Sequence, residues 1–307
     1  MSKIFAAVVV IFFATSSQAQ APRSVEGFQE RGVKRYERGD YEGAVADFTQ
    51  VIELSSLPVG GRAPGRNERL AFGGSDDAAN TSGTVRVLDP RAAAAYTNRG
   101  IARLALGDAD DAIDDFDHAL AISPFLFRAY NARGSARFKK GDFEGAVADY
   151  GRAIRLEPHY AEPYSNRANA RLAEGDLKGA LADYDRALKL DPHNAVFFNN
   201  RGEARYQAGD LEGALADFDR AISLNPRLAD PYHGRGTALL KKGETERAVA
   251  DFTKALSLND RLAGSYVNRG VALLLQGKLE DAERDFGLAL MLDPSLRPTV
   301  EAVKRPR

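Results

Sequence analysis

Apolar and polar positions along this chain follow a pattern that returns every 34 residues. One period, residues 198–226, reads FNNRGEARYQAGDLEGALADFDRAISLNP. In each half, apolar and small residues recur at intervals of three or four, which is the spacing of one face of an α-helix. Gly209 and Asp210 separate the two halves. The pattern predicts two antiparallel helices joined by a tight turn.

Seven copies of this period lie in the chain, and we expect them to stack as an array. The slot around Arg66, between the first copy and the second, lacks the pattern. Stacked helix pairs bury a continuous core in which each pair contacts mainly its neighbours, so the 307 residues need not form two ordinary domains. One position in the first helix, the marker position, is glycine in six copies and alanine in the seventh. Its residues are Gly32, Gly100, Gly134, Ala168, Gly202, Gly236 and Gly270.

The Gly-Asp pair predicts how each turn is built. Glycine closes the first helix because it adopts the left-handed conformation at little cost, and aspartate then caps the second helix by accepting from its first amides. The pair weakens to Gly243-Glu244 and Gly277-Lys278 in the last two copies. We expect those two turns to be less well capped.

The repeated residues resemble the tetratricopeptide repeat family, whose signature runs aromatic, glycine, alanine, aromatic, alanine, proline over 34 residues. The resemblance covers about three-quarters of the chain and implies an all-α, right-handed superhelical solenoid of antiparallel helix pairs with a concave groove. The leading aromatics are Phe28, Tyr96, Tyr130, Tyr164, Phe198, Tyr232 and Tyr266, and the inner alanines are Ala44, Ala112, Ala146, Ala180, Ala214, Ala248 and Ala282.

An arginine precedes the marker position in all seven copies, where many family members carry leucine. Sixteen residues later an aspartate follows in every copy. Because each arginine has a matching acid, we predict ion pairs across each hairpin or between adjacent hairpins, in preference to an anion-binding arginine row. The predicted structural pairs are Arg99 with Asp115, Arg133 with Asp149, Arg167 with Asp183, Arg201 with Asp217, and Arg235 with Asp251; Arg31 with Asp47 and Arg269 with Asp285 complete the set.

The N-terminus predicts export. Lys3 precedes an apolar run over 4–14 and then small polar residues, the layout of a secretory signal peptide cleaved after Ala19. The run is too short to span a bilayer, which needs about 20 residues, although an uncleaved anchor is the alternative. With no cysteine, the chain has no disulfide, lipid-modified cysteine or thiol nucleophile. We expect a bacterial protein in the periplasm or secreted, without stable membrane insertion after cleavage.

The same reasoning divides the chain into five parts. The insert is rich in glycine and we expect it to be flexible, with a functional segment as the alternative. The first repeat could extend away from the other six. The parts are a signal peptide (1–19), a first repeat (20–58), the insert (59–92), six contiguous repeats (93–296) and a short C-terminal cap or tail (297–307).

Candidate catalytic and metal-binding residues are few. The net charge is −1, so no basic stripe suggests nucleic acid. The four histidines lie at turns or helix surfaces without metal-ligand spacing, and no phosphate-binding loop or nucleophile motif occurs. We predict no catalytic, cofactor-binding or metal site, and a protein that is not an enzyme.

Residues that vary between copies are the candidates for partner binding, because the repeated ones build the frame. Helical arithmetic places Asn200 away from the packed side, and asparagine recurs at this position with Ala132 and Gly234 interrupting the row. The row resembles the asparagine ladder of the O-linked N-acetylglucosamine transferase repeats, which binds a peptide main chain; a polar helix surface is the alternative. The groove candidates are Asn98, Asn131, Asn166, Asn169, Asn200, Glu203, Tyr206, His233 and Asn268, with Ser135, Thr237 and Phe138 nearby.

The sequence therefore favours a non-catalytic scaffold that holds an extended peptide or a partner surface in its groove. The lysine-asparagine clamp of relatives that bind a free C-terminal carboxylate is not reproduced, since the corresponding pairs include Asn131 with Ser135 and Asn199 with Glu203. The alternative is a self-assembling envelope protein, in which uncovered apolar surface makes homo-oligomers.

Overall fold

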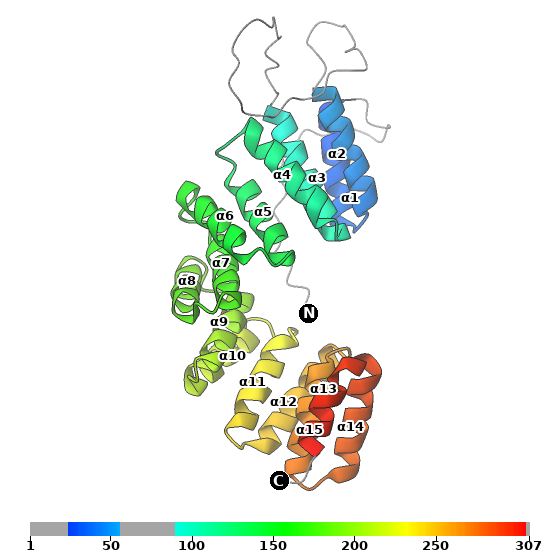
Figure 1. Cartoon of the computed structure of the whole chain (residues 1–307), viewed down its shortest axis with the longest axis vertical. Coiled ribbons are helices and arrows are strands. Elements are labelled where there is room, and N and C mark those ends of the chain that lie inside the picture. The colour runs from blue at the N-terminus through cyan, green and yellow to red at the C-terminus, as the bar shows by residue number, and fades with distance from the viewer. Residues whose placement is uncertain (1–23, 56–89, 305–307) are drawn as a thin grey trace, which may run out of the picture. The chain divides into compact units, whose positions relative to one another are not determined.

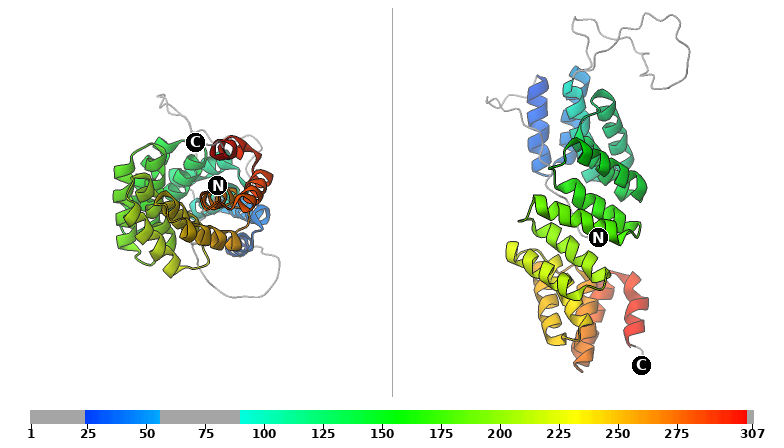
Figure 2. Two further views of the ribbon diagram at one scale, coloured as in Figure 1. Left: turned by 90° about the horizontal axis from the view of Figure 1, so that it is seen from below. Right: turned by 90° about the vertical axis from the view of Figure 1, so that its left-hand side faces the viewer.

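The computed structural model describes residues 24–55 and 90–304, and all regular secondary structure in these residues is helical (Figure 1). Contacts divide the chain at Pro158 into two compact units. In each unit the helix pairs follow one another in chain order (Figure 2). The predicted all-α array of antiparallel helix pairs is confirmed.

The first unit holds three helix pairs. Their bounds are α1 (Val25–Glu37), α2 (Tyr41–Ser55), α3 (Pro90–Leu106), α4 (Ala109–Ile122), α5 (Phe127–Lys139) and α6 (Phe143–Leu156). The second unit holds four pairs and a terminal helix. Their bounds are α7 (Glu162–Ala173), α8 (Leu177–Leu190), α9 (Ala195–Gln207), α10 (Leu211–Leu224), α11 (Asp230–Lys241), α12 (Thr245–Leu258), α13 (Ala263–Leu275), α14 (Leu279–Leu292), the short 3-10 turn η1 (Pro294–Leu296) and α15 (Arg297–Lys304).

Each pair closes where an aromatic ring of its second helix meets the marker residue of its first. A Cβ on Gly202 would lie 2.8 Å from Cε1 of Phe218, too close for any side chain unless the ring moved. Phe218 is 1 % exposed and well packed in this position. The glycine therefore sets how closely the two helices approach.

The first pair stacks directly on the second. Val51 and Ile52 of α2 form a buried cluster with Ala95 of α3, and Nη1 of Arg99 donates to Oγ1 of Thr49 at 3.1 Å. The alternative in which the first repeat extends away from the others is therefore wrong. The helix α3 also begins at Pro90, so residues 90–92 of the predicted insert belong to the second pair; the rest, from 59 to 89, lies outside the described residues.

The turns show why capping varies. Gly209 has φ of 81° and ends α9 as expected. The carboxylate of Asp142 accepts from the amide of Gly145 at 2.9 Å, and Asp40, Asp176 and Asp210 do the same to Gly43, Gly179 and Gly213. Glu244 and Lys278 make no such bond, so the expectation for the last two turns is confirmed.

Asp108 makes no cap bond either, which the sequence analysis missed. A Cβ on Gly145 would lie 2.2 Å from Oδ2 of Asp142, so the capping geometry needs glycine three residues after the aspartate. In the second pair Asp111 occupies this position. Its Cβ excludes the rotamer that the other aspartates use.

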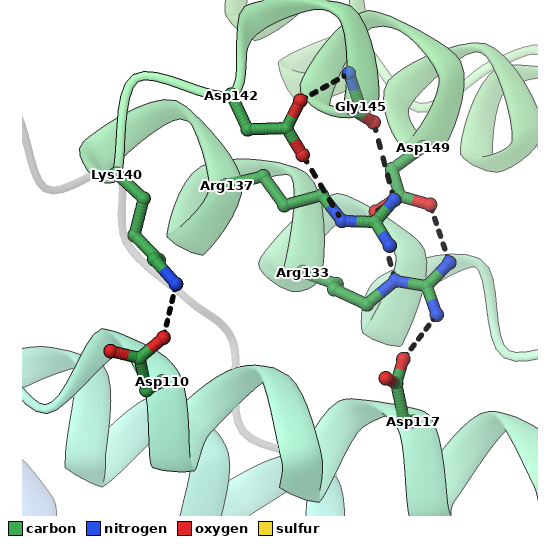
Figure 3. A network of polar contacts seen from close by, with 8 residues as sticks. All are labelled: Asp110, Asp117, Arg133, Arg137, Lys140, Asp142, Gly145 and Asp149. Atoms are coloured by element: carbon green, nitrogen blue, oxygen red, sulfur yellow. Dashed lines mark hydrogen bonds and ion pairs between the residues drawn. The ribbon is translucent and has the colours of Figure 1, made fainter.

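A buried aspartate lies at the centre of each pair. In the third pair, Nε and Nη2 of Arg133 donate to Asp149 at 2.9 and 2.6 Å, and Asp149 is 3 % exposed (Figure 3). Burial alone would lower the pKa of Arg133, but its hydrogen bonds to Asp149 and Asp117 raise it above the ordinary value. The equivalent bonds join Arg31 to Asp47, Arg99 to Asp115, Arg167 to Asp183, Arg201 to Asp217, Arg235 to Asp251 and Arg269 to Asp285.

A second arginine, four residues further along the first helix, binds the same aspartate. Nη1 of Arg137 donates to Asp149 at 2.9 Å, and Figure 3 shows the carboxylate between the two guanidinium groups. The sequence analysis did not identify this second partner. The corresponding residues are Arg35, Arg103, Arg171 and Arg205, whereas Leu239 and Leu273 replace them in the last two pairs.

The first arginine also links neighbouring pairs. Arg133 donates to Asp117 of α4, Arg201 to Asp185 of α8 and Arg235 to Asp219 of α10. Pairing within one hairpin and pairing between two hairpins were both open from the sequence. The first arginine forms both kinds of ion pair, one with the buried aspartate of its own hairpin and one with an aspartate of the preceding hairpin. Its guanidinium also lies over the leading aromatic three residues earlier, as Arg201 does over Phe198 at 5.6 Å.

The helix α15 covers part of the last pair. Val300 is buried against a cluster that includes Val267 and Phe286, and Nζ of Lys304 lies 5.2 Å from the ring of Phe286. Four large apolar residues of α14 stay exposed: Leu279, Leu288, Met291 and Leu292.

Replacing Asp142 by alanine should lower the free energy of unfolding by about 1 kcal/mol, because the amide of Gly145 loses its acceptor. Asp108→Ala is the matched control in the same unit, since Asp108 makes no cap bond. Urea unfolding of both variants measures the difference. Equal losses would contradict the role assigned to the glycine.

Asp183→Ala should lower the free energy of unfolding by about 3 to 5 kcal/mol, because it leaves Arg167 and Arg171 facing each other without their acid. Lys178→Ala, at an exposed position of α8 in the same unit, should change it by less than about 0.5 kcal/mol. Thermal unfolding monitored by circular dichroism compares the two. Similar shifts would show that the ion pair is not a structural requirement.

Candidate functional site

The first helices of neighbouring pairs contact one another within each unit, as α1 contacts α3 and α9 contacts α11. This contact places the first helices on the inner side of each stack. The inner side is therefore lined by the residues that vary between copies, and the repeated aromatic and acidic residues of the second helices lie behind them.

An open pocket of about 270 Å³ lies between α9 and α11 on this inner side. It belongs entirely to the second unit. Three of the predicted groove residues line it: Glu203, Tyr206 and His233. The rest of the lining is Gln207, Phe218, Gly234 and Thr237.

Gly234 accounts for the position of this pocket. It occupies the place that asparagine holds in four other copies, and a Cβ there would lie 2.5 Å from Cε1 and Cζ of Phe218. The ring of Phe218 therefore fits against two glycines, Gly202 and Gly234. Since α11 presents no side chain at this point, the ring of Phe218 fills the space next to Gly234 and forms the floor of the pocket.

Glu203 supplies the pocket's carboxylate. Its Oε1 accepts from Nδ2 of Asn199 at 3.3 Å, and among the described residues it has no ion-pair partner. Surrounding protein raises the pKa of Glu203 above its ordinary value by desolvation, and the charge of Asp230 adds to this, while the bond from Asn199 acts the other way. The side chain still reaches solvent, so the charge is available to a ligand.

His233 is held in place on the opposite wall. Its Nδ1 lies 2.7 Å from Oγ of Ser265, and its ring packs against Phe252 with centroids 5.7 Å apart. Burial lowers the pKa of His233, which keeps the imidazole neutral at neutral pH. Ser265 has no exposed surface, so this serine cannot act as a nucleophile on a bound substrate.

Tyr206 forms an aromatic wall that already carries a cation. Nζ of Lys241 lies 4.9 Å from the centroid of its ring, within the range of a cation–π contact. Both residues lie at the end of their helices where the pocket opens.

The asparagines are placed differently from the expectation. Asn98 and Asn200 are each 5 % exposed, so the prediction that Asn200 points away from the packed side is wrong. Asn131 is also buried and Asn166 is half-buried. The physical reason is that each first helix packs on its own second helix and also on the first helices of neighbouring pairs. A residue that points away from the second helix can therefore be buried against a neighbouring first helix.

Two further candidates have structural partners. Asn169 accepts a hydrogen bond from the hydroxyl of Tyr184 inside its own pair, and Nδ2 of Asn268 donates to Oγ1 of Thr237 at 3.2 Å. Oγ1 of Thr237 in turn donates to the carbonyl of His233. The structure thus brings Glu203, Tyr206 and His233 together and leaves the asparagines as contacts between helices.

One sequence signal could have located the pocket. Gly234 and Ala132 interrupt the asparagine row. Gly234 is an inner position without a side chain, and Glu203 is the one acidic residue among its equivalents in the seven copies. These two departures from the repeat indicate where the pocket lies.

In residues 24–55 and 90–304, no three His, Asp or Glu side chains gather as a metal ion would require. In the same residues, no helix is both long enough and apolar enough to cross a membrane.

Two models of the tetratricopeptide repeat match the sequence. One, described as TPR repeat, matches residues 134–173, 168–209 and 202–243; the other, described as tetratricopeptide repeat, matches 67–126 and 233–295. The chain is a tetratricopeptide repeat protein. Neither model includes the first helix pair, which the structure places in the same array.

Solved structures share the fold of this tetratricopeptide repeat protein. A tetratricopeptide repeat protein from Parabacteroides merdae is 20% identical with a TM-score of 0.65, over 92% of this chain and all of that one. The APC/C hetero-tetramer Cut9–Hcn1 is 14% identical with a TM-score of 0.64, over 91% of this chain and 56% of that one. TTC0263 from Thermus thermophilus is 23% identical with a TM-score of 0.51, over 58% and 97%. No curated protein is significantly similar in sequence.

Glu203→Gln should make the tetratricopeptide repeat protein more stable relative to wild type as the pH rises from about 4 to about 7. A carboxyl whose pKa is raised in the folded state contributes stability that is present below its unfolded pKa and lost above it, and glutamine lacks this loss. The titratable residues near Glu203 are Asp230, Tyr184 and, on the opposite wall of the pocket, His233, and the variant retains all three.

Urea midpoints of both proteins at the two pH values measure the change, which should stay below about 1 kcal/mol because the side chain reaches solvent. Glu280→Gln, at an exposed position of α14, controls for the loss of one carboxylate. A difference between E203Q and wild type that is constant with pH would show that desolvation of Glu203 is negligible.

Proposed function

We propose that this tetratricopeptide repeat protein is an exported, non-catalytic scaffold that binds an extended segment of a partner protein along the inner side of its first helices. The observation that supports this most is the pocket between α9 and α11, where variable residues from neighbouring pairs converge on open space. Tetratricopeptide repeats bind protein or peptide partners, and no enzyme family matches the chain.

The mechanism differs from the one the asparagine row suggested. Main-chain capture by Asn98 and Asn200 has little support, because both side chains are buried between helices. Contact instead comes from Glu203, Tyr206 and Gln207, which line the pocket. The frame keeps these groups in place before a partner arrives, which limits the entropy lost on binding.

A photo-crosslinking amino acid at position 207 tests the proposal in the cells that produce the protein. Gln207 lines the pocket and is exposed, so the residue placed there should crosslink to a discrete partner. The same group at exposed Lys178 of α8 is the control on the outer side. Identical products from both positions, or products from Lys178 alone, would remove the inner-side mechanism.

Export is part of this proposal and rests on the sequence of residues 1–19. The mature protein should then begin at Gln20, which N-terminal sequencing detects. An N-terminus that still carries residues 1–19 would favour the retained anchor.

Self-assembly is the second candidate. Met291 is 79 % exposed and lies beside the exposed Leu288 and Leu292, an apolar surface that another copy could cover. Light scattering over a range of concentrations decides between the two, since a constant monomer mass excludes self-assembly and leaves the scaffold proposal intact.

A further inference from the structure

The pocket between α9 and α11 differs from the rest of the inner side in its charge. The arginines of the frame each bind an aspartate, as Arg201 binds Asp217 and Asp185. Glu203, in contrast, meets only the amide of Asn199 among the described residues. An acid with no ion-pair partner among the described residues is therefore exposed at this pocket.

The groups around Glu203 favour a positive ligand. Asp230 adds a second negative charge nearby, and His233 on the opposite wall is uncharged at neutral pH. Oδ1 of Asn199 is buried and has no hydrogen-bond partner among the described residues. Solvent does not reach this oxygen, so Glu203 alone of the two residues offers an acceptor to a ligand.

The walls of the pocket suit the stem of a long basic side chain. Tyr206 on α9 supplies an aromatic wall, and the edge of the buried ring of Phe218 forms the floor. The contact between Lys241 and Tyr206 shows that this ring accepts an ammonium group at one face. A lysine or arginine stem can pack along such surface while its charged end reaches the carboxylate.

We propose that this pocket binds a lysine or arginine side chain of the partner segment, with Glu203 pairing with the charged end and Tyr206 packing along the stem. This inference rests on the proposed function and adds the chemistry of the residue that is recognised. An apolar side chain would leave Glu203 unpaired, and an acidic one would face two carboxylates. The pocket thus selects by charge, and contacts elsewhere on the inner side hold the rest of the segment.

A phage-displayed library of random linear peptides, selected on the purified mature protein, tests this proposal. The selected peptides should share a lysine or arginine at one position. Replacing that residue by norleucine or citrulline in a synthetic peptide should weaken binding about 10-fold, the loss typical of one hydrogen bond to a charged group. Isothermal titration calorimetry measures the affinities.

Variants of the protein locate the effect. E203Q should weaken the basic peptide about 10-fold and leave the norleucine peptide unchanged, so the two losses should not add. E280Q, which removes an exposed carboxylate of α14, should leave both affinities unchanged. Tyr206→Ala should weaken both peptides, because the stem contact is lost in each case.

The outcomes separate this inference from the proposed function. Peptides that bind the inner side without a shared basic residue, or equally to wild type and E203Q, overturn the inference and leave the scaffold in place. A library that yields no binder to the folded protein overturns both. A shared basic residue whose effect disappears in E203Q supports both.

Discussion

The structure depends on a carboxylate that is buried at the centre of every helix pair. Each of these aspartates is between 1 and 7 % exposed, on the second helix, and faces an arginine of the first. A buried charge without its partner is strongly destabilising, so the two helices can pack in the one arrangement that brings the groups together. A buried ion pair adds little net stability over an apolar contact. Its consequence here is geometric, because it fixes one helix against the other.

The same arginine extends this constraint along the array. Arg133 binds Asp149 in its own pair and Asp117 in the pair before, and its guanidinium lies over the ring of Tyr130. The planar group has donors enough for two acids and a face for an aromatic ring, which a lysine could not supply. One side chain therefore joins the pair, the neighbouring pair and the leading aromatic. Because every repeat carries this arginine, the residues of a single repeat are sufficient to join it to its neighbour.

A frame fixed in this way leaves the inner positions free to differ. Asn268 and Thr237 are joined by a hydrogen bond between α13 and α11. At Gly234 the buried ring of Phe218 takes the place that a side chain would occupy, and Glu203 nearby is exposed. The local chemistry arises from one missing side chain and one added charge, with no change of the backbone. The residues that give the pocket its chemistry are therefore those that differ from the repeat.

The sequence by itself determined the period, the helix pairs, the closing glycines and the aspartate that lies sixteen residues after the first arginine of each copy and pairs with it, because these residues recur at fixed spacing and each copy supports the others. It also placed Glu203, Tyr206 and His233 among the groove residues. Tertiary structure alone decided which of the inner residues are accessible. Asn200 looked exposed because helical arithmetic describes a helix packed on one side, whereas α9 is packed by its own second helix and by neighbouring first helices. The tertiary structure also showed that Arg137 shares an aspartate with Arg133 and that Asp108 does not cap its helix. Both findings depend on distances between side chains, which the spacing of residues in the sequence does not specify.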